Sequence, residues 1–354
     1  MKTQHHTGLR HHMVKAPEGA AMFSRSALGL GLAVLVSAAA AETVSPVDIA
    51  FASHRDGTWE IYVADESGAT QTRLTRLNGH SRFPLWSPDR SQIAFATQRT
   101  ASGGEWEFRV MNADGSNPRR LLSGLVGKSH REWSRDGRRI AVTAEVDGNV
   151  DIFVVHAATG RLTRLTTSPG EDRDPSWSPD GAFIAFSSER DGSREIYVMR
   201  ADGSDARRLT NSGAKDASPM WSPDGSRIAF VSDRDGEGEL FLMRADGSSL
   251  ERVTEQAFSS SDPPRWSPDG SQIAFQIAHQ GRHDIGVVAL RERQQRVLVA
   301  TPHNDGSYSW SKDGRKLAYI SGPGGHETLH VVNVGTGESR QLTTTWSLTP
   351  DWSR

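Results

Sequence analysis

A tryptophan–serine pair that recurs at nearly constant spacing limits what this chain can fold into more than any other feature. The pair occurs seven times, at intervals of 42–47 residues, at Trp86, Trp133, Trp177, Trp221, Trp266, Trp310 and Trp352. Six copies continue into a polar turn of the type Ser-Pro-Asp-Gly, and an apolar triplet of the type Ile-Ala-Phe begins seven residues after each of those tryptophans. A third apolar strand such as Ile196–Val198, a turn such as Ala201–Ser204 and a short fourth strand such as Arg208–Thr210 complete the unit.

Four short strands in about 44 residues are the sequence signature of one β-propeller blade. The turn residues agree, because proline presets φ, aspartate bonds to its own backbone and glycine adopts a positive φ. In the Ile-Ala-Phe strand, alternation places Ile and Phe on one face and Ala on the other. The small alanine lets the neighbouring blade approach closely, so we predict an all-β chain of packed blades.

Seven blades are expected because the two ends of the repeat complete one another. The triplet at 49–51 has no Trp-Ser strand before it, whereas Trp352 and Ser353 have no second strand after them. The segment at about 348–353 should therefore pair with the first triplet and close the ring. Closure matters because it leaves no large apolar blade face in water.

Residues 1–41 are predicted to be a cleavable signal peptide. A short positive region ends at Arg25, the segment 27–36 is apolar, and three alanines at 39–41 precede Glu42. We interpret residues 1–21 as an over-extended start, and we expect the propeller to occupy residues 42–354. The apolar segment is too short for a good membrane span, so the predicted location is periplasmic or secreted.

The charge and cysteine content narrow the range of partners. Removing the four basic and one acidic side chains of residues 1–41 from totals of 41 and 43 leaves 37 and 42, a net charge of −5. A nucleic-acid partner would need a basic surface, so none is predicted. The chain has no cysteine, which excludes disulfides, thiolate metal sites and a cysteine nucleophile.

The succession of Trp-Ser-Pro-Asp-Gly, Ile-Ala-Phe, Ser-x-Arg-Asp-Gly and Ile-Tyr-Val-Met-x-Ala-Asp-Gly resembles the propeller repeat of the TolB family. The third motif stands at Ser53–Gly57, Ser188–Gly192 and Ser232–Gly236. The resemblance implies a periplasmic protein that binds an envelope partner, such as a Pal-like lipoprotein or a Tol component, through its propeller. It departs from TolB in two respects, because an N-terminal α/β domain is missing and because TolB has six blades.

A binding scaffold without catalysis or cofactor, monomeric, is the function that we favour from the sequence. The repeat also occurs in the propellers of prolyl oligopeptidase-type enzymes and, more loosely, of oligogalacturonate lyases. However, no Gly-x-Ser-x-Gly motif is present. The alternatives that stay open are a metal-dependent polysaccharide lyase or hydrolase, and a sensor of a carbohydrate or small ligand.

The candidate binding residues precede the tryptophans, where the units differ most. Strand order puts the Ser-Pro-Asp-Gly and Ala-Asp-Gly-Ser turns on one face of the ring and the more variable connections on the other, which is the predicted binding face. Residues expected to surround the channel mouth there are His80, Arg82, His130, Arg173, Asp174, Lys215, Asp216, Asp262, His303 and Asp305.

Other repeated or conspicuous residues are given structural interpretations. The tryptophans occupy a fixed packing position. An acid precedes the third strand in six units, and we expect it to pair with the arginine of Ser-x-Arg-Asp-Gly. Neither the acidic run from Asp233 to Glu239 nor the three histidines His80, His130 and His303 is predicted to hold a metal.

Overall fold

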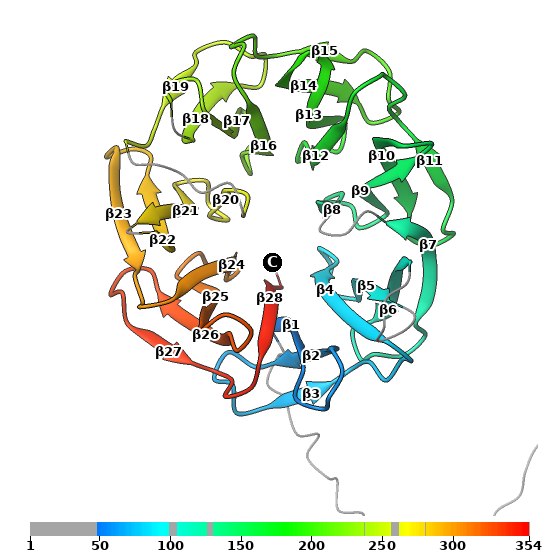
Figure 1. Ribbon diagram of the computed structural model, residues 1–354, viewed down its shortest axis with the longest axis vertical. Helices are drawn as coiled ribbons and strands as arrows, with labels where there is room; N and C mark the ends of the chain where they lie inside the picture. The colour runs from blue at the N-terminus through cyan, green and yellow to red at the C-terminus, as the bar shows by residue number, and fades with distance from the viewer. Residues whose placement is uncertain are drawn as a thin grey trace, which may run out of the picture. The chain divides into compact units, whose positions relative to one another are not determined.

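The computed structural model describes residues 48–98, 105–125, 130–236, 238–255, 262–279 and 281–353. Its 28 strands form seven antiparallel four-stranded sheets, arranged as blades around one axis (Figure 1). The described residues contain no helix, and therefore none that could cross a membrane. The predicted seven-bladed propeller is confirmed. The predicted signal peptide at 1–41 lies outside the described residues.

The strands of each blade run in order from the axis outward. Blade 1 contains β28 (Ser347–Trp352), β1 (Ile49–Ser53), β2 (Glu60–Ala64) and β3 (Gln71–Arg73). Blade 2 contains β4 (His80–Trp86), β5 (Gln92–Gln98), β6 (Trp106–Asn112) and β7 (Arg119–Leu125). Blade 3 contains β8 (Arg131–Trp133), β9 (Arg139–Val146), β10 (Asn149–His156) and β11 (Leu162–Arg164). Blade 4 contains β12 (Asp172–Trp177), β13 (Phe183–Asp191), β14 (Ser193–Arg200) and β15 (Arg207–Arg208).

The remaining three blades follow the same plan. Blade 5 contains β16 (Asp216–Trp221), β17 (Arg227–Ser232), β18 (Glu239–Arg244) and β19 (Glu251–Arg252). Blade 6 contains β20 (Arg265–Trp266), β21 (Gln272–His279), β22 (Arg282–Ala289) and β23 (Gln294–Val299). Blade 7 contains β24 (Asn304–Trp310), β25 (Lys316–Gly322), β26 (Thr328–Asn333) and β27 (Ser339–Gln341).

The ring closes where β28 pairs with β1, as predicted. Ile49 lies opposite Trp352, and Ser53 lies opposite Ser347, in an antiparallel register with one bulge. The backbone N–H of Ser353 also donates to the carbonyl oxygen of Asp48 at 2.7 Å. Blade 1 is thus built from both ends of the described chain, and Figure 1 shows β28 and β1 side by side.

The apolar core lies between neighbouring blades. Ala50 of blade 1 packs in one cluster with Ile93 and Phe95 of blade 2, and all three side chains are fully buried. Ala229 of blade 5 meets Ile273 of blade 6 in the same way. The predicted division of the Ile-Ala-Phe strand is confirmed, because each alanine faces the larger residues of the next blade.

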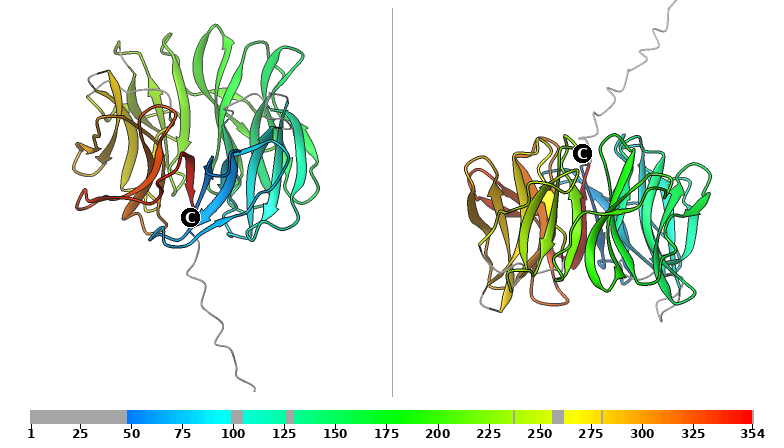
Figure 2. Two further views of the ribbon diagram at one scale, coloured as in Figure 1. Left: turned by 60° about the horizontal axis from the view of Figure 1, so that its bottom comes forward. Right: turned by 90° about the horizontal axis from the view of Figure 1, so that it is seen from above.

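The two faces of the ring differ in their connections, and Figure 2 shows the blades from the side. Antiparallel order within each blade puts the turns between first and second strands and between third and fourth strands on one face, the turn face. The other connections form the opposite face, the loop face, as predicted. On the turn face, Gly225 has a φ of 73° and packs against Pro179 of the preceding blade.

The acid that precedes the third strand does not pair with the arginine that the sequence suggested. Oε1 of Glu195 accepts a hydrogen bond from Nη2 of Arg208, in the fourth strand, at 2.6 Å. The arginine of Ser-x-Arg-Asp-Gly turns toward the inner strand instead, where Arg190 meets Asp172 at 3.1 Å. The expected pairing was therefore wrong. Glu60 with Arg73 and Asp151 with Arg164 repeat the first of these pairings. Arg234 with Asp216 repeats the second.

Candidate binding face

The inner strands of five blades share a bulge, marked by a left-handed residue three positions before the tryptophan. These residues have φ between 46° and 57° and are Phe83, Asp174, Ser218, Ser307 and Thr349. A non-glycine residue in this conformation costs on the order of 1–2 kcal/mol, so the surrounding sheet must hold it. The backbone repeats while the side chains differ. We call the positions three and four residues before each tryptophan the axial margin, which lies toward the loop face.

Arg82 is a cation of the axial margin that has no counterion among the described residues. Its guanidinium carbon lies 4.6 Å from the ring centroid of Trp59 in blade 1. Burial lowers the pKa of Arg82. Across the described ranges, its buried Nε has no hydrogen-bond partner, and no carboxylate oxygen lies within 4 Å of its guanidinium.

An aromatic cluster supports Arg82 where the ring closes. Trp346 packs edge-on against Trp59, with ring centroids 4.7 Å apart, and its indole N–H donates to Glu327 at 2.8 Å. Nδ1 of His80 accepts a hydrogen bond from the backbone N–H of Trp59 at 3.2 Å. His80 is therefore held by blade 1, and it helps to fix the aromatic ring beneath Arg82.

His130 lies just before β8, among charged side chains of three blades. Its Nε2 is buried and has no hydrogen-bond partner in the described part of the chain. Burial first, and then the positive charges of Arg265 and Arg131, lower the pKa of His130 to about 4, whereas the carboxylate of Asp174 acts in the opposite direction. His130 is thus neutral at pH 7.

Arg131 occupies a position that is proline in five of the seven inner strands, two residues before the tryptophan. Its guanidinium carbon lies 5.1 Å from the ring centroid of Phe83, and burial lowers its pKa to about 10. Phe83 adjoins Arg82, and Arg131 adjoins His130. Arg82, Arg131 and His130 therefore follow one another around the ring in blades 2 and 3, and we call them the basic arc.

Asp174 and Asp262 tie neighbouring blades together. Oδ2 of Asp174 accepts hydrogen bonds from the hydroxyl of Ser187 at 2.9 Å and from the backbone N–H of Ser218 at 3.3 Å. Oδ2 of Asp262 accepts one from the backbone N–H of Ser307 at 2.7 Å. Both acids lie on the axial margin, and both have donors from the next blade.

Arg173, Lys215 and His303 are three further residues predicted for the binding face. Arg173 donates through Nε to Glu171 at 2.6 Å, and this hydrogen bond raises its pKa. Lys215 and His303 are exposed. In the described structure neither side chain forms a hydrogen bond or ion pair.

Asp216 and Asp305 lie inside their blades and are fully buried. The carboxylate of Asp216 meets Arg234 at 2.8 Å and the hydroxyl of Ser212 at 3.1 Å. The carboxylate of Asp305 accepts hydrogen bonds from the backbone N–H of Thr301 at 2.9 Å and from the hydroxyl of Thr301 at 2.8 Å. Internal donors therefore engage both carboxylates.

Arg265 and the aromatic cluster were not among the residues predicted to line the site. Arg265 directly precedes a repeated tryptophan, at a position that is otherwise Leu, Glu, Ser, Met or Asp. Its basic character was the available signal. Trp59 and Trp346 are tryptophans outside the repeat, which was a second signal.

The described residues bring no three His, Asp or Glu side chains into an arrangement that could hold a metal ion. His80, His130 and His303 have separate surroundings, as their contacts above show. In the acidic run after β17, Oδ1 of Asp233 accepts from the backbone N–H of Lys215 at 2.6 Å, and Asp235 faces Arg252 at 3.4 Å.

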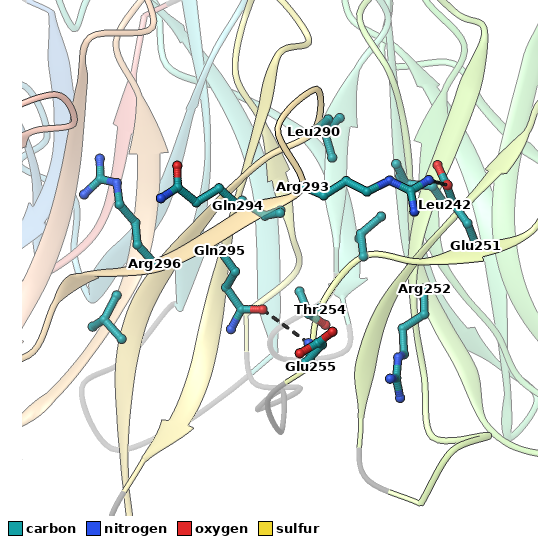
Figure 3. A pocket seen from close by; sticks show the side chains of 13 residues that line it. Leu242, Glu251, Arg252, Thr254, Glu255, Leu290, Arg293, Gln294, Gln295 and Arg296 are labelled. Carbon is teal, nitrogen blue, oxygen red and sulfur yellow. Dashed lines mark hydrogen bonds and ion pairs between the residues drawn. The ribbon is translucent and has the colours of Figure 1, made fainter.

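A groove of about 700 Å³ lies on the outer side of the ring, between blades 5 and 6 (Figure 3). Its rim carries charges of both signs, and Glu251 pairs with Arg293 at 2.6 Å. The backbone N–H of Glu255 donates to the side chain of Gln295 at 3.3 Å. Its remaining lining includes Leu242, Val253, Val288, Leu290, Arg252, Gln294, Arg296 and Val297.

Comparison with solved structures shows the fold. TolB from Acinetobacter baumannii is 19% identical, with a TM-score of 0.56 over 83% of this chain and 79% of that one. Oligogalacturonate lyase from Vibrio parahaemolyticus is 15% identical, with a TM-score of 0.67 over 80% of this chain and 86% of that one. At such identities the propeller architecture is shared and the chemistry is not implied.

Comparison of sequences is more specific. The protein TolB homolog of Chlorobium chlorochromatii is 34% identical over 128 residues, which are 36% of this chain and 28% of that protein. The Tol-Pal system protein TolB of Anaeromyxobacter dehalogenans is 33% identical over 121 residues, 34% of this chain and 27% of that protein. These matches span less than a third of the relatives' length. The profile of the TolB beta propeller domain matches residues 101–263 and 256–354, well over half of the sequence, and this chain therefore belongs to the TolB β-propeller family.

Proposed function

We propose that this propeller is a periplasmic scaffold that binds a protein of the cell envelope, within an assembly of the Tol–Pal type. The family supports this proposal, since a relative is named as a Tol-Pal system protein. The segment at 1–41 would direct export, and the propeller would act as a monomer.

The observation that carries the binding proposal is the axial margin. One backbone bulge recurs in five blades, yet the residues that it presents are Phe, Asp, Ser, Ser and Thr. Beside them, Arg82 has no counterion in the described structure and His130 has a buried nitrogen without a partner. A surface that repeats its backbone but varies its side chains is suited to recognising one asymmetric partner.

Retention of a Pal-type lipoprotein tests the proposal. Purified propeller would be immobilised and exposed to detergent-solubilised envelope proteins of the organism that encodes it, with and without crosslinking. We expect the lipoprotein or a Tol component to be retained by the parent, and the Arg82→Glu variant to retain at least tenfold less, because a repulsive charge then faces the partner.

A matched variant on the turn face controls for charge. Lys312 is exposed there, in the turn that follows Trp310, and Lys312→Glu makes the same change in net charge. This variant should retain as much partner as the parent. Retention of no envelope protein by the correctly folded parent would contradict the proposal.

A further inference from the structure

We infer that the basic arc of Arg82, Arg131 and His130 binds carboxylates of an extended, acidic peptide segment that the protein partner presents, one at Arg82 and another beside His130. The inference rests on the proposed function, because it names the chemistry that the partner brings to the same face. Arg82 and His130 carry the argument through their unmatched atoms, and Arg131 contributes positive charge beside His130.

The unmatched atoms call for a hydrogen-bond acceptor. A buried donor without an acceptor costs free energy that an incoming group can recover. Nε of Arg82 is such a donor in the described structure, and Nε2 of His130 is a second buried nitrogen without a partner. A carboxylate accepts two parallel N–H bonds from one guanidinium, which suits Arg82.

The electrostatics of the site favour an anion. The positive charges of Arg131 and Arg265 lower the pKa of His130, and among the described residues the carboxylate of Asp174 opposes them. Asp174 is itself engaged by Ser187 and by the next blade. An anion placed beside His130 would therefore meet the positive charges of Arg131 in blade 3 and Arg265 in blade 6.

The neighbouring side chains favour a peptide over a sugar. Binding of a sugar ring relies on an open aromatic face, but Trp59 beneath Arg82 is only 2% exposed. Phe83, next to Arg82 in the sequence, is half-buried, and half-buried Leu348 packs against the apolar cluster that contains Trp59. Apolar contacts around a cation match a segment in which acidic and aliphatic residues alternate.

A pair of labelled peptides tests the inference directly. The probe is a ten-residue peptide in which glutamate and leucine alternate, and its partner carries glutamine in place of each glutamate. Fluorescence anisotropy with the parent propeller should show saturable binding of the glutamate peptide and at least tenfold weaker binding of the glutamine peptide, since charge-assisted hydrogen bonds are lost.

Two variants connect the binding to Arg82. Arg82→Gln should weaken binding of the glutamate peptide about tenfold or more, and Arg82→Lys should give an intermediate affinity because the charge remains without the planar fork. Lys312→Gln on the turn face should change nothing. The melting temperature of each variant is measured alongside, so that a loss of folding is not mistaken for a loss of binding.

Several outcomes would overturn the inference. They are equal binding of both peptides, an unchanged affinity in folded Arg82→Gln, or a trigalacturonate probe that binds to the parent more tightly than the peptide and requires Arg82. The proposed function is tested by a separate outcome. If the parent retains the lipoprotein and Arg82→Gln retains it equally, the scaffold function stands and the carboxylate site does not.

Discussion

Oδ2 of Asp351 accepts a hydrogen bond from the backbone N–H of Trp86 at 2.7 Å, and so joins the inner strand of blade 1 to that of blade 2. The same bond occurs elsewhere in the ring. Glu132 accepts from the N–H of Trp177 at 2.8 Å, and the hydroxyl of Ser309 accepts from that of Trp352 at 3.0 Å. In these three cases, the side chain before one repeated tryptophan accepts a hydrogen bond from the backbone of the next blade.

Removing residues 346–354 should abolish cooperative folding. The deletion takes away β28, exposes the paired edge of β1 and removes Trp352, which is 3% exposed. Thermal unfolding followed by circular dichroism should show loss of the parent transition. A synthetic peptide of residues 346–354, added in trans, should restore it. A truncated chain as stable as the parent would mean that the ring does not depend on this pairing.

Asp351→Ala should lower the free energy of unfolding by about 1.5–3 kcal/mol, because the Trp86 N–H loses a charged acceptor. Asp351→Asn keeps an acceptor oxygen and should cost less than half as much. Urea unfolding followed by tryptophan fluorescence measures both. Equal stability of Asp351→Ala and the parent would show that the bond between blades contributes nothing.

Glu195→Ala should be strongly destabilising, by about 3–5 kcal/mol, since it leaves buried donors without their acceptor. Burial alone would raise the pKa of Glu195, but hydrogen bonds from Thr210 and from the N–H groups of Gly213 and Ser212 outweigh it and lower the pKa to about 2. The stabilisation is therefore complete above pH 4.5 and is lost as the pH falls toward 2.

Unfolding of the Glu195 variant and the parent between pH 2 and pH 7 checks both statements. The difference in stability between them should shrink steadily below pH 4.5. Glu145→Gln, at an exposed position of β9, is the control and should match the parent at every pH.

Arg234→Ala should cost about 3 kcal/mol, because Asp216 would stay buried without its cation. Arg234 also donates to the hydroxyl of Ser232 at 2.8 Å and lies 4.8 Å from the ring centroid of Phe241. Denaturant unfolding measures the loss, and Arg244→Ala at an exposed position is the control. If both arginine variants were equally stable, the buried pair would have no net effect.

His130 should make the protein less stable as the pH falls from 6.5 toward 4. Its pKa is lowered to about 4 in the folded protein from an ordinary value of 6.5, so the unfolded chain binds more protons in that range. The loss is at most about 3.5 kcal/mol. His130→Asn should remove this part of the pH dependence, which urea unfolding at pH 7 and pH 5 would reveal. An identical slope in both proteins would contradict the burial of His130.

The sequence predicted the blades well because their spacing and turn residues follow from backbone geometry. It failed for the ion pairs, because an arginine such as Arg234 has two acids, Asp216 and Glu239, within reach along its blade. Only the packed sheet decides between them. The binding residues stay a prediction. From the sequence, Asp216 and Asp305 could not be separated from Arg82 and His130, since sequence does not show which carboxylate points into a blade.

The pairing of β28 with β1 also has a consequence for how the protein is made. β1 emerges first from the ribosome, and its partner follows roughly 300 residues later, after about 15–60 s of synthesis. Blade 1 cannot be completed during that interval, so the finished ring appears only after the other six blades have been synthesised. Until then, the edge of β1 that pairs with β28 stays without its partner.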